Sequence, residues 1–248
     1  MEWKVEIIGW KDDFNDQRHF ILEKIQEILR KYYNSSFIEK FPLTIGYKSS
    51  TSICEDKSKN PCSHPDRSRI CLSVEDTYWC QYIFQLSHEL CHCITSRSNL
   101  PKGIRWFDEF LCCFTSYFIL KQFESDYEMV NYLYPNNKEA LKRYISDIEK
   151  SGLKAGTDPK ELFINKREEY LCDEDKIKKD DIYYLYLYRK LNTDFSGLSF
   201  IGKIHLIDFS EVHDVETLMS RLIADATENE LSVLDIISDL FSLSIYFK

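Results

Sequence analysis

The sequence predicts an α+β protein, in which a small mixed sheet near the N-terminus is followed by a mainly helical C-terminal lobe. The runs typical of strands all lie before residue 77. Beyond that residue, apolar side chains recur at helical spacing almost to the end of the chain. Glycine and proline number only 7 and 6 in 248 residues, so long irregular segments are not expected.

The N-terminal region combines three predicted strands with one helix. The strands are residues 3–10, 41–49 and 69–76. Residues 15–33 instead place apolar side chains three and four positions apart, which is typical of an amphipathic helix. The order strand, helix, strand, polar loop, strand leads directly into two long helices.

These two helices are predicted at residues 77–96 and 106–123. At about 100° per residue, the first helix carries an apolar stripe on one side. The stripe consists of Trp79, Tyr82, Ile83, Leu86, Leu90 and Ile94. His88 and His92 fall on the other side, which we expect to open on a cavity. The second helix is apolar almost all round, which predicts that it is buried on most sides.

The chain divides into two predicted lobes, residues 1–125 and residues 126–248. The clearest linker is residues 151–159. Residues 181–191 fit a helix or a strand, and their helical surroundings favour the helix. The other predicted helices of the second lobe are residues 128–135, 137–150, 159–171, 215–225 and 228–243.

Composition and charge narrow the possible functions. The net charge is −9 and no basic stripe is present, which argues against a nucleic-acid partner. The longest apolar run, residues 110–120, is too short to span a bilayer, so no membrane partner is expected. The first residues lack the basic and apolar regions of a signal peptide. We therefore expect a cytoplasmic protein.

The nine cysteines are an odd number and include no C-x-x-C pair. Without an export signal, reduced thiols are the expected state. Cys54, Cys62, His64 and Cys71 lie in one polar segment, but their spacing fits no standard zinc pattern. The segment is interpreted as a loop with scattered thiols, and a second metal site is the alternative.

The segment HELCH, residues 88–92, has the pattern H-E-x-x-H. On a helix, His88 and His92 lie one turn apart on the same face, so both imidazoles can reach one ion. Zinc accepts two histidine nitrogens and retains positions for a third ligand and a water. Glu89 flanks that face, where it could take a proton from the metal-bound water and pass it to a leaving amine. The alternative is a solvated helix face that carries two histidines by chance.

A third ligand is predicted at Glu109. The longer pattern HExxHxxGxxH is excluded because Thr95 and Ser98 stand at its glycine and third histidine positions. Glu109 lies near the start of the second long helix in an apolar run, where a buried carboxylate is costly unless it is paired or binds a metal. The alternative is an exposed residue at the helix start, with Asp108 as a partial cap.

HELCH followed by WFDEFLCCFTSYF resembles the gluzincin family of zinc metallopeptidases over residues 70–125. WFDE is similar to the W-x-N/D-E segment of aminopeptidase-like members, and E-x-x-C is similar to the E-x-x-A segment of ImmA/IrrE-type peptidases. The resemblance implies a zincin-like fold with Zn2+ as cofactor. It also implies that His88, His92 and Glu109 hold the ion and that Glu89 is the general base.

Further roles follow from the same resemblance. Residues 69–76 would be the edge strand that borders the cleft and pairs with an extended substrate. A D-x-x-Y pattern matches Asp181 and Tyr184, and Tyr184 would then stabilise the oxyanion. The chain departs from the family where Phe110 and Leu111 follow Glu109, and where no G-A-M-E-N-like exopeptidase segment precedes the histidine helix.

Several supporting residues remain open. Tyr184 has three tyrosine neighbours in its stretch, and packing is the alternative role for each of them. His205 and His213 are other candidates for the oxyanion, or ordinary surface or core histidines. Asp108 is the nearest carboxylate that could accept the second N–H of a metal-bound histidine, a common arrangement around metals.

The sequence thus predicts a zinc-dependent peptidase that acts on a peptide or protein. The first alternative is a metal-binding regulatory or toxin-like protein without general proteolytic activity. The second is a helical interaction protein in which HELCH is accidental. The lobe 126–248 could cover the cleft or bind a protein partner, and no residue decides between these roles.

Overall fold

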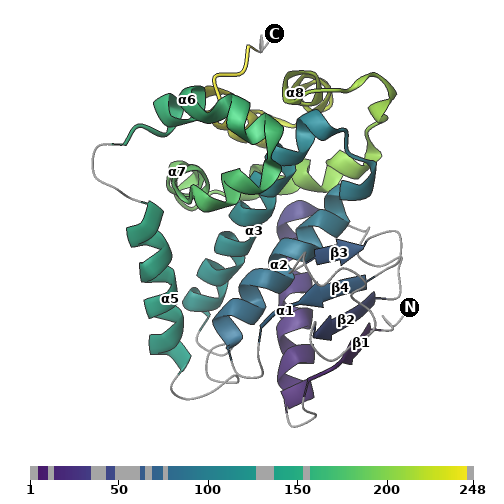
Figure 1. The fold of residues 1–248 in the computed structure, drawn as a ribbon, viewed down its shortest axis with the longest axis vertical. Coiled ribbons are helices and arrows are strands. Elements are labelled where there is room, and N and C mark those ends of the chain that lie inside the picture. Colours follow the sequence, from purple (N-terminus) through teal and green to yellow (C-terminus); the bar gives the residue numbers. More distant parts are fainter. Residues whose placement is uncertain are drawn as a thin grey trace.

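The computed structural model describes residues 5–10, 14–34, 43–47, 62–64, 69–74, 78–126, 137–152 and 157–244. These residues form a small sheet at one side of a larger set of helices (Figure 1). The predicted α+β class, with a small N-terminal sheet before a mainly helical chain, is confirmed at this level.

The sheet consists of β1 (Val5–Ile8), β2 (Leu43–Tyr47), β3 (Cys62–His64) and β4 (Arg69–Leu72). The strand order is β1-β2-β4-β3, in which β1, β2 and β4 are parallel and β3 runs antiparallel to β4. The sheet is therefore mixed, as predicted. Ile45 pairs with Ile70 across β2 and β4, and both are fully buried, so this pair fixes the middle of the sheet in the core.

The prediction that residues 69–76 form the edge strand is wrong. The regular strand in this segment is β4, and it has β2 on one side and β3 on the other. In the part of the sheet that the structure describes, the edges are β1 and β3. β3 lies in the segment that we interpreted as a loop, because so short a strand gives almost no alternating pattern.

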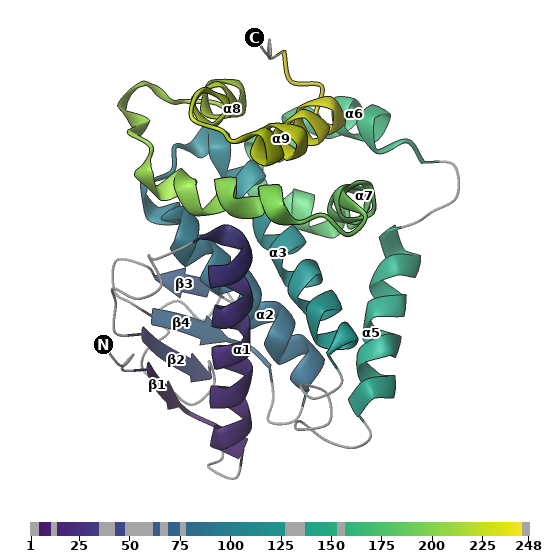
Figure 2. The ribbon, with the colours of Figure 1, turned by 180° about the vertical axis from the view of Figure 1, so that it is seen from behind.

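Three long helices lie between the sheet and the rest of the molecule: α1 (Asn15–Tyr33), α2 (Trp79–Thr95) and α3 (Arg105–Ser125). All three match the predicted helices to within two residues at each end. Figures 1 and 2 show α1 and α2 next to the sheet, and α3 beside α2. The apolar stripe of α2 is buried as predicted, and α3 is buried on nearly every side.

The regular elements of the C-terminal part are all helices within the residues that the structure describes. Its elements are α5 (Asn137–Gly152), α6 (Pro159–Cys172), η6 (Glu174–Lys179), α7 (Ile182–Leu191), η7 (Ser196–Leu206), η8 (Phe209–Glu211), α8 (Val215–Ala224) and α9 (Glu228–Leu240). The helix favoured at 181–191 is confirmed as α7. The helix predicted at 128–135, and part of the linker predicted at 151–159, lie outside the described residues.

One continuous hydrophobic core joins the N-terminal and C-terminal parts of the chain. On α3, the rings of Trp106 and Phe110 lie with centroids 5.2 and 4.8 Å from that of Phe241, just after α9. Phe163 of α6 lies 5.1 Å from Trp106. The C-terminal helices therefore complete the burial of α3. None of the described helices combines the length and the apolar character that a bilayer-spanning helix needs.

Candidate metal centre

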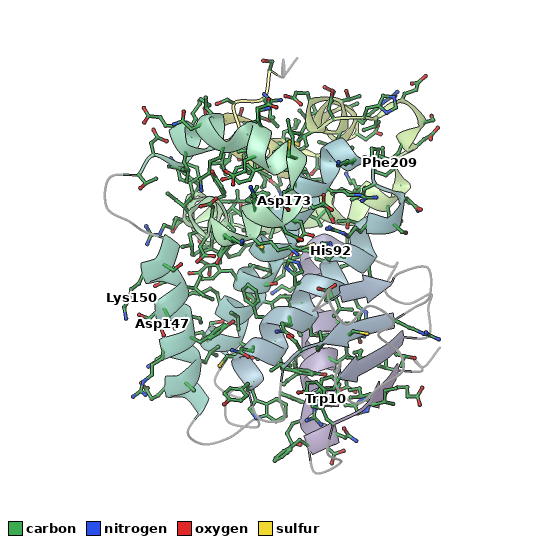
Figure 3. The ribbon with its side chains drawn as sticks, in the orientation of Figure 1. Trp10, His92, Asp147, Lys150, Asp173 and Phe209 are labelled. Atoms are coloured by element: carbon green, nitrogen blue, oxygen red, sulfur yellow. The ribbon has the colours of Figure 1, made fainter. Side chains whose placement is uncertain are left out.

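His88 and His92 stand one turn apart on α2 and face α3. Their ring centroids are 4.7 Å apart and their planes are nearly perpendicular, at 86°. The two residues are only 6% and 3% exposed, so the side of α2 that we expected to open on a cavity is covered. Figure 3 shows His92 in the interior, between the sheet and the C-terminal helices.

Glu109, near the start of α3, faces both imidazoles. Its Oε2 lies 3.1 Å from Nε2 of His88, and its Oε1 lies 3.6 Å from Nε2 of His92. Ligand atoms bound tetrahedrally to zinc are roughly 3.3 Å apart, given bonds of about 2.0–2.1 Å. The distances from Glu109 to the two imidazoles are therefore close to that between two ligands of one ion. Glu109 is 1% exposed, which is incompatible with an exposed helix-start residue.

Asp108 holds the other ring nitrogen of His92. Nδ1 of His92 donates to Oδ2 of Asp108 at 2.8 Å, and the hydroxyl of Thr95 donates to Oδ1 at 2.6 Å. This contact turns Nε2 of His92 toward Glu109. A carboxylate on the far nitrogen commonly orients a histidine that binds a metal. The structure thus brings Asp108 to the place that the sequence suggested, and adds Thr95, which the sequence did not indicate.

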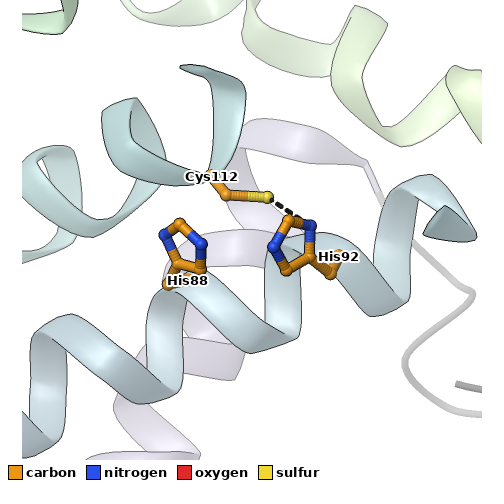
Figure 4. A group of neighbouring side chains, drawn as sticks. All are labelled: His88, His92 and Cys112. Atoms are coloured by element: carbon orange, nitrogen blue, oxygen red, sulfur yellow. Dashed lines mark hydrogen bonds between the residues drawn. The ribbon is translucent and has the colours of Figure 1, made fainter. Parts of the chain in front are cut away.

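Cys112, one turn after Glu109, offers a second donor set. His88, His92 and Cys112 have donor atoms within 4.8 Å of one another, and Figure 4 shows them converging from two helices. However, Sγ of Cys112 lies 3.0 Å from Nδ1 of His92, the nitrogen bound to Asp108. A nitrogen that donates a proton has no lone pair for a metal. Glu109, which faces both Nε2 atoms, and Cys112 are therefore the two candidates for a third ligand.

Glu89 is buried next to the first histidine, with 2% of its surface exposed. Its Oε2 accepts no hydrogen bond from any residue that the structure describes. Burial of a carboxylate oxygen without a donor is unfavourable, and such an atom often marks a functional site or a position for a ligand. A general base needs an atom that can accept a proton, and Oε2 of Glu89 meets this requirement among the described residues.

Two cations that sequence reasoning missed also reach Glu109. The left-handed Ser96, with φ 56°, ends α2 and reverses the chain. Arg97 follows it, contacts Oε1 of Glu109 and lies 3.1 Å from Oδ2 of Asp108. Lys178 of η6 lies 2.9 Å from Oε2 of Glu109. No sequence signal identifies either contact, because each partner is on another element.

The buried charges shift one another's pKa values. Burial alone would lower the pKa of His92, but the carboxylates of Asp108 and Glu109 reverse this effect and raise it to about 10. Burial also lowers the pKa of His88, and its bond to Glu109 offsets this only in part. The imidazoles hold the pKa of Glu109 well below its usual value, although burial opposes them. Without metal, His92 is thus charged and His88 neutral near pH 7.

Tyr184 makes its hydrogen bond and its ring contact with residues other than the proposed ligands. Its hydroxyl donates to Asp181 at 2.8 Å, and its ring centroid lies 5.6 Å from that of Tyr117. Within the described residues, no hydrogen bond joins Tyr184 to the histidines or to Glu109. The alternative candidates for the oxyanion are His205 and His213. His205 lies half-buried on η7, and His213 lies exposed after η8, so neither is on α2 or α3.

The cysteine segment differs from expectation at Cys71. This residue on β4 is disulfide-bonded, so the prediction of reduced thiols is wrong here, and Cys71 is not available to a second metal. Cys54 and the side chains of Cys62 and His64 lie outside the described residues. Among the described residues, the other cysteines are free, in agreement with the prediction: Cys80, Cys91, Cys93, Cys112, Cys113 and Cys172.

Comparison of the chain with known protein families, with curated proteins and with solved structures finds no match. The resemblance to gluzincins therefore rests on the short motifs around the two histidines.

Proposed function

We propose that the chain is a zinc-dependent peptidase of gluzincin type, with Zn2+ held by His88, His92 and Glu109. The observation that carries this proposal is that both Nε2 atoms face the carboxylate of Glu109, while Asp108 binds Nδ1 of His92. Two imidazoles and one carboxylate are a common ligand set of catalytic zinc. When bound, the ion would polarise a water and the carbonyl of a peptide.

Glu89 is the group that moves protons in this proposal. Its Oε2 would accept a proton from the attacking water and deliver it to the leaving amine. This role is supported by its burial beside His88 and by an oxygen that no described donor occupies. Asp108 would act through His92, because its bond to Nδ1 keeps Nε2 turned toward Glu109.

The sheet supports a zincin-like fold and an extended peptide as substrate. β3 is antiparallel, lies at an edge of the described sheet and packs close to α2. An edge strand can pair with a peptide backbone through its free N–H and C=O groups. β3, and not β4, is therefore the strand to which we assign peptide binding.

A second candidate is a regulatory or toxin-like protein that binds a metal without general proteolysis. The burial of the centre favours this alternative, because Glu109 and Glu89 are only 1% and 2% exposed. A peptide bond would have to reach side chains that are almost closed off from solvent. Both candidate functions use the same metal site. They differ in whether a peptide bond reaches Glu89 and is cleaved.

The test compares wild type with Glu89→Gln. Both proteins should hold about one zinc per chain after reconstitution, measured by elemental analysis. Glu89→Gln should cleave a mixture of unstructured peptides at least about 100-fold more slowly, because general-base catalysis typically contributes 10²–10⁴-fold. Glu168→Gln, the same change at an exposed position on α6, is the matched control and should cleave normally.

The outcomes separate the candidates. A wild type that takes up no zinc excludes both of them. Zinc uptake with no cleavage by wild type favours the regulatory protein. Cleavage by Glu89→Gln at the wild-type rate would remove Glu89 from the mechanism.

A further inference from the structure

We infer that Lys178 competes with the metal ion for Glu109, so that zinc can bind only when Lys178 leaves this carboxylate. The inference rests on the metal site proposed above. It adds that Lys178 limits how tightly this site binds zinc. It assigns a role to a residue of η6, far along the chain from the histidine motif.

The contacts of Glu109 are the first argument. Its Oε1 contacts Arg97 and lies 3.6 Å from His92, while its Oε2 lies 3.1 Å from His88 and 2.9 Å from Lys178. Each oxygen that would bind the ion is therefore already next to one imidazole and one cation. In the metal-free protein, Arg97 and Lys178 supply the positive charge that zinc would otherwise bring to this carboxylate.

Repulsion between cations is the second argument. Arg97 and Lys178 both contact the buried carboxylate of Glu109. A divalent ion bound to the same two oxygens would lie close to both of these cations. Since cations repel strongly where water is excluded, zinc and both side chains are not expected to share Glu109.

Lys178 is the cation that is free to move. Arg97 also contacts Asp108 at 3.1 Å and Glu174 at 3.3 Å, so other carboxylates hold it in place. Lys178 has a second partner one turn back on its own segment, Asp175 at 2.9 Å, and its side chain is 35% exposed. Lys178 can therefore leave Glu109, keep an ion pair and remain in contact with water.

The experiment measures zinc affinity by competition with a coloured chelator. Lys178→Met should bind zinc at least about tenfold more tightly than wild type, a change of about 1.4 kcal/mol. Lys178→Gln should change the affinity in the same direction. Lys176→Met is the matched control on η6, because Lys176 pairs at the surface with Glu169 at 2.8 Å, and its zinc affinity should equal that of wild type.

A second measurement on the same proteins tests the direction of the effect. Without zinc, Lys178→Met should melt at a lower temperature than wild type, because Glu109 loses a partner, and zinc should raise its melting temperature by more. Zinc affinity that is unchanged or weaker in Lys178→Met would overturn the inference and leave the proposed site intact. Absence of zinc binding in wild type and in all variants would instead remove the site itself.

Discussion

At the proposed zinc site, His92 is the residue at which protonation and metal binding would compete. It lies between two buried carboxylates, which raise its pKa to about 10 in the metal-free protein although burial acts in the opposite direction. An imidazole has to be neutral before its nitrogen can bind a metal. Zinc and a proton should therefore compete for Nε2 of His92 near neutral pH.

This competition predicts that zinc binding at pH 7 releases about one proton per ion. It also predicts that zinc affinity increases with pH until the pKa of His92, about 10, is passed. Calorimetric titration in two buffers with different ionisation enthalpies measures the released proton. A binding heat that does not depend on the buffer would mean that His92 is already neutral.

The choice between Glu109 and Cys112 is also made at the scale of single residues. Because both Nε2 atoms face Glu109, Glu109→Gln should weaken zinc binding by more than about 100-fold, beyond the usual effect of groups around the ligands. Cys112→Ser should leave it nearly unchanged. The Co2+-loaded wild type should show no thiolate-to-metal absorption band. The reverse pattern would make Cys112 the third ligand.

At the scale of elements, Gly197 sets the distance between η7 and α9. A Cβ atom at this position would lie 2.2 Å from the carbonyl oxygen of Asn229 and 2.5 Å from Cγ2 of Val233. A backbone oxygen cannot rotate out of the way as a side chain can. η7 also contacts α1 and α2, so its position affects the helices on which the centre is built.

Gly197→Ala is therefore predicted to destabilise the protein by about 1–3 kcal/mol, as overpacking of a core usually does. Urea unfolding of the metal-free protein measures the change. Ser232→Ala, at an exposed position on α9, serves as the control and should unfold at the wild-type midpoint. Equal stability of Gly197→Ala and wild type would mean that η7 shifts without cost.

At the scale of the whole molecule, the C-terminal helices are needed to bury α3. Phe110 of α3 packs on Phe241, and α3 also contacts η6 and α7. Without these elements, the apolar sides of α3 would face water. The same helix carries Asp108 and Glu109, so the geometry of the centre depends on residues far along the chain.

A fragment of residues 1–125 should therefore fail to form the centre. We expect it to bind a hydrophobic dye strongly, to lack the near-ultraviolet circular dichroism of packed aromatic rings and to bind zinc far more weakly than the full chain. The full chain, unfolded and refolded in the same way, is the control. A fragment that binds zinc as tightly as the full chain would show that residues 1–125 fold alone.

The local parts of this protein could be predicted from its sequence. The helices α1 and α2 follow from the spacing of their own apolar residues, α3 from its nearly continuous apolar run, and α7 only from its helical surroundings. His88 and His92 share a face because one helical turn fixes their relation. Glu109 could be chosen because a carboxylate in an apolar helix needs a partner, and Asp108 because it is the nearest carboxylate by position.

Only the tertiary structure decided which distant groups meet. Lys178 and Arg97 at Glu109, Cys112 at His92 and the position of β3 at the sheet edge have no local signal. Periodicity within a segment reports which of its sides is buried, but it does not report what lies against that side. Contacts between segments depend on the packing of the whole chain, so they became visible only in three dimensions.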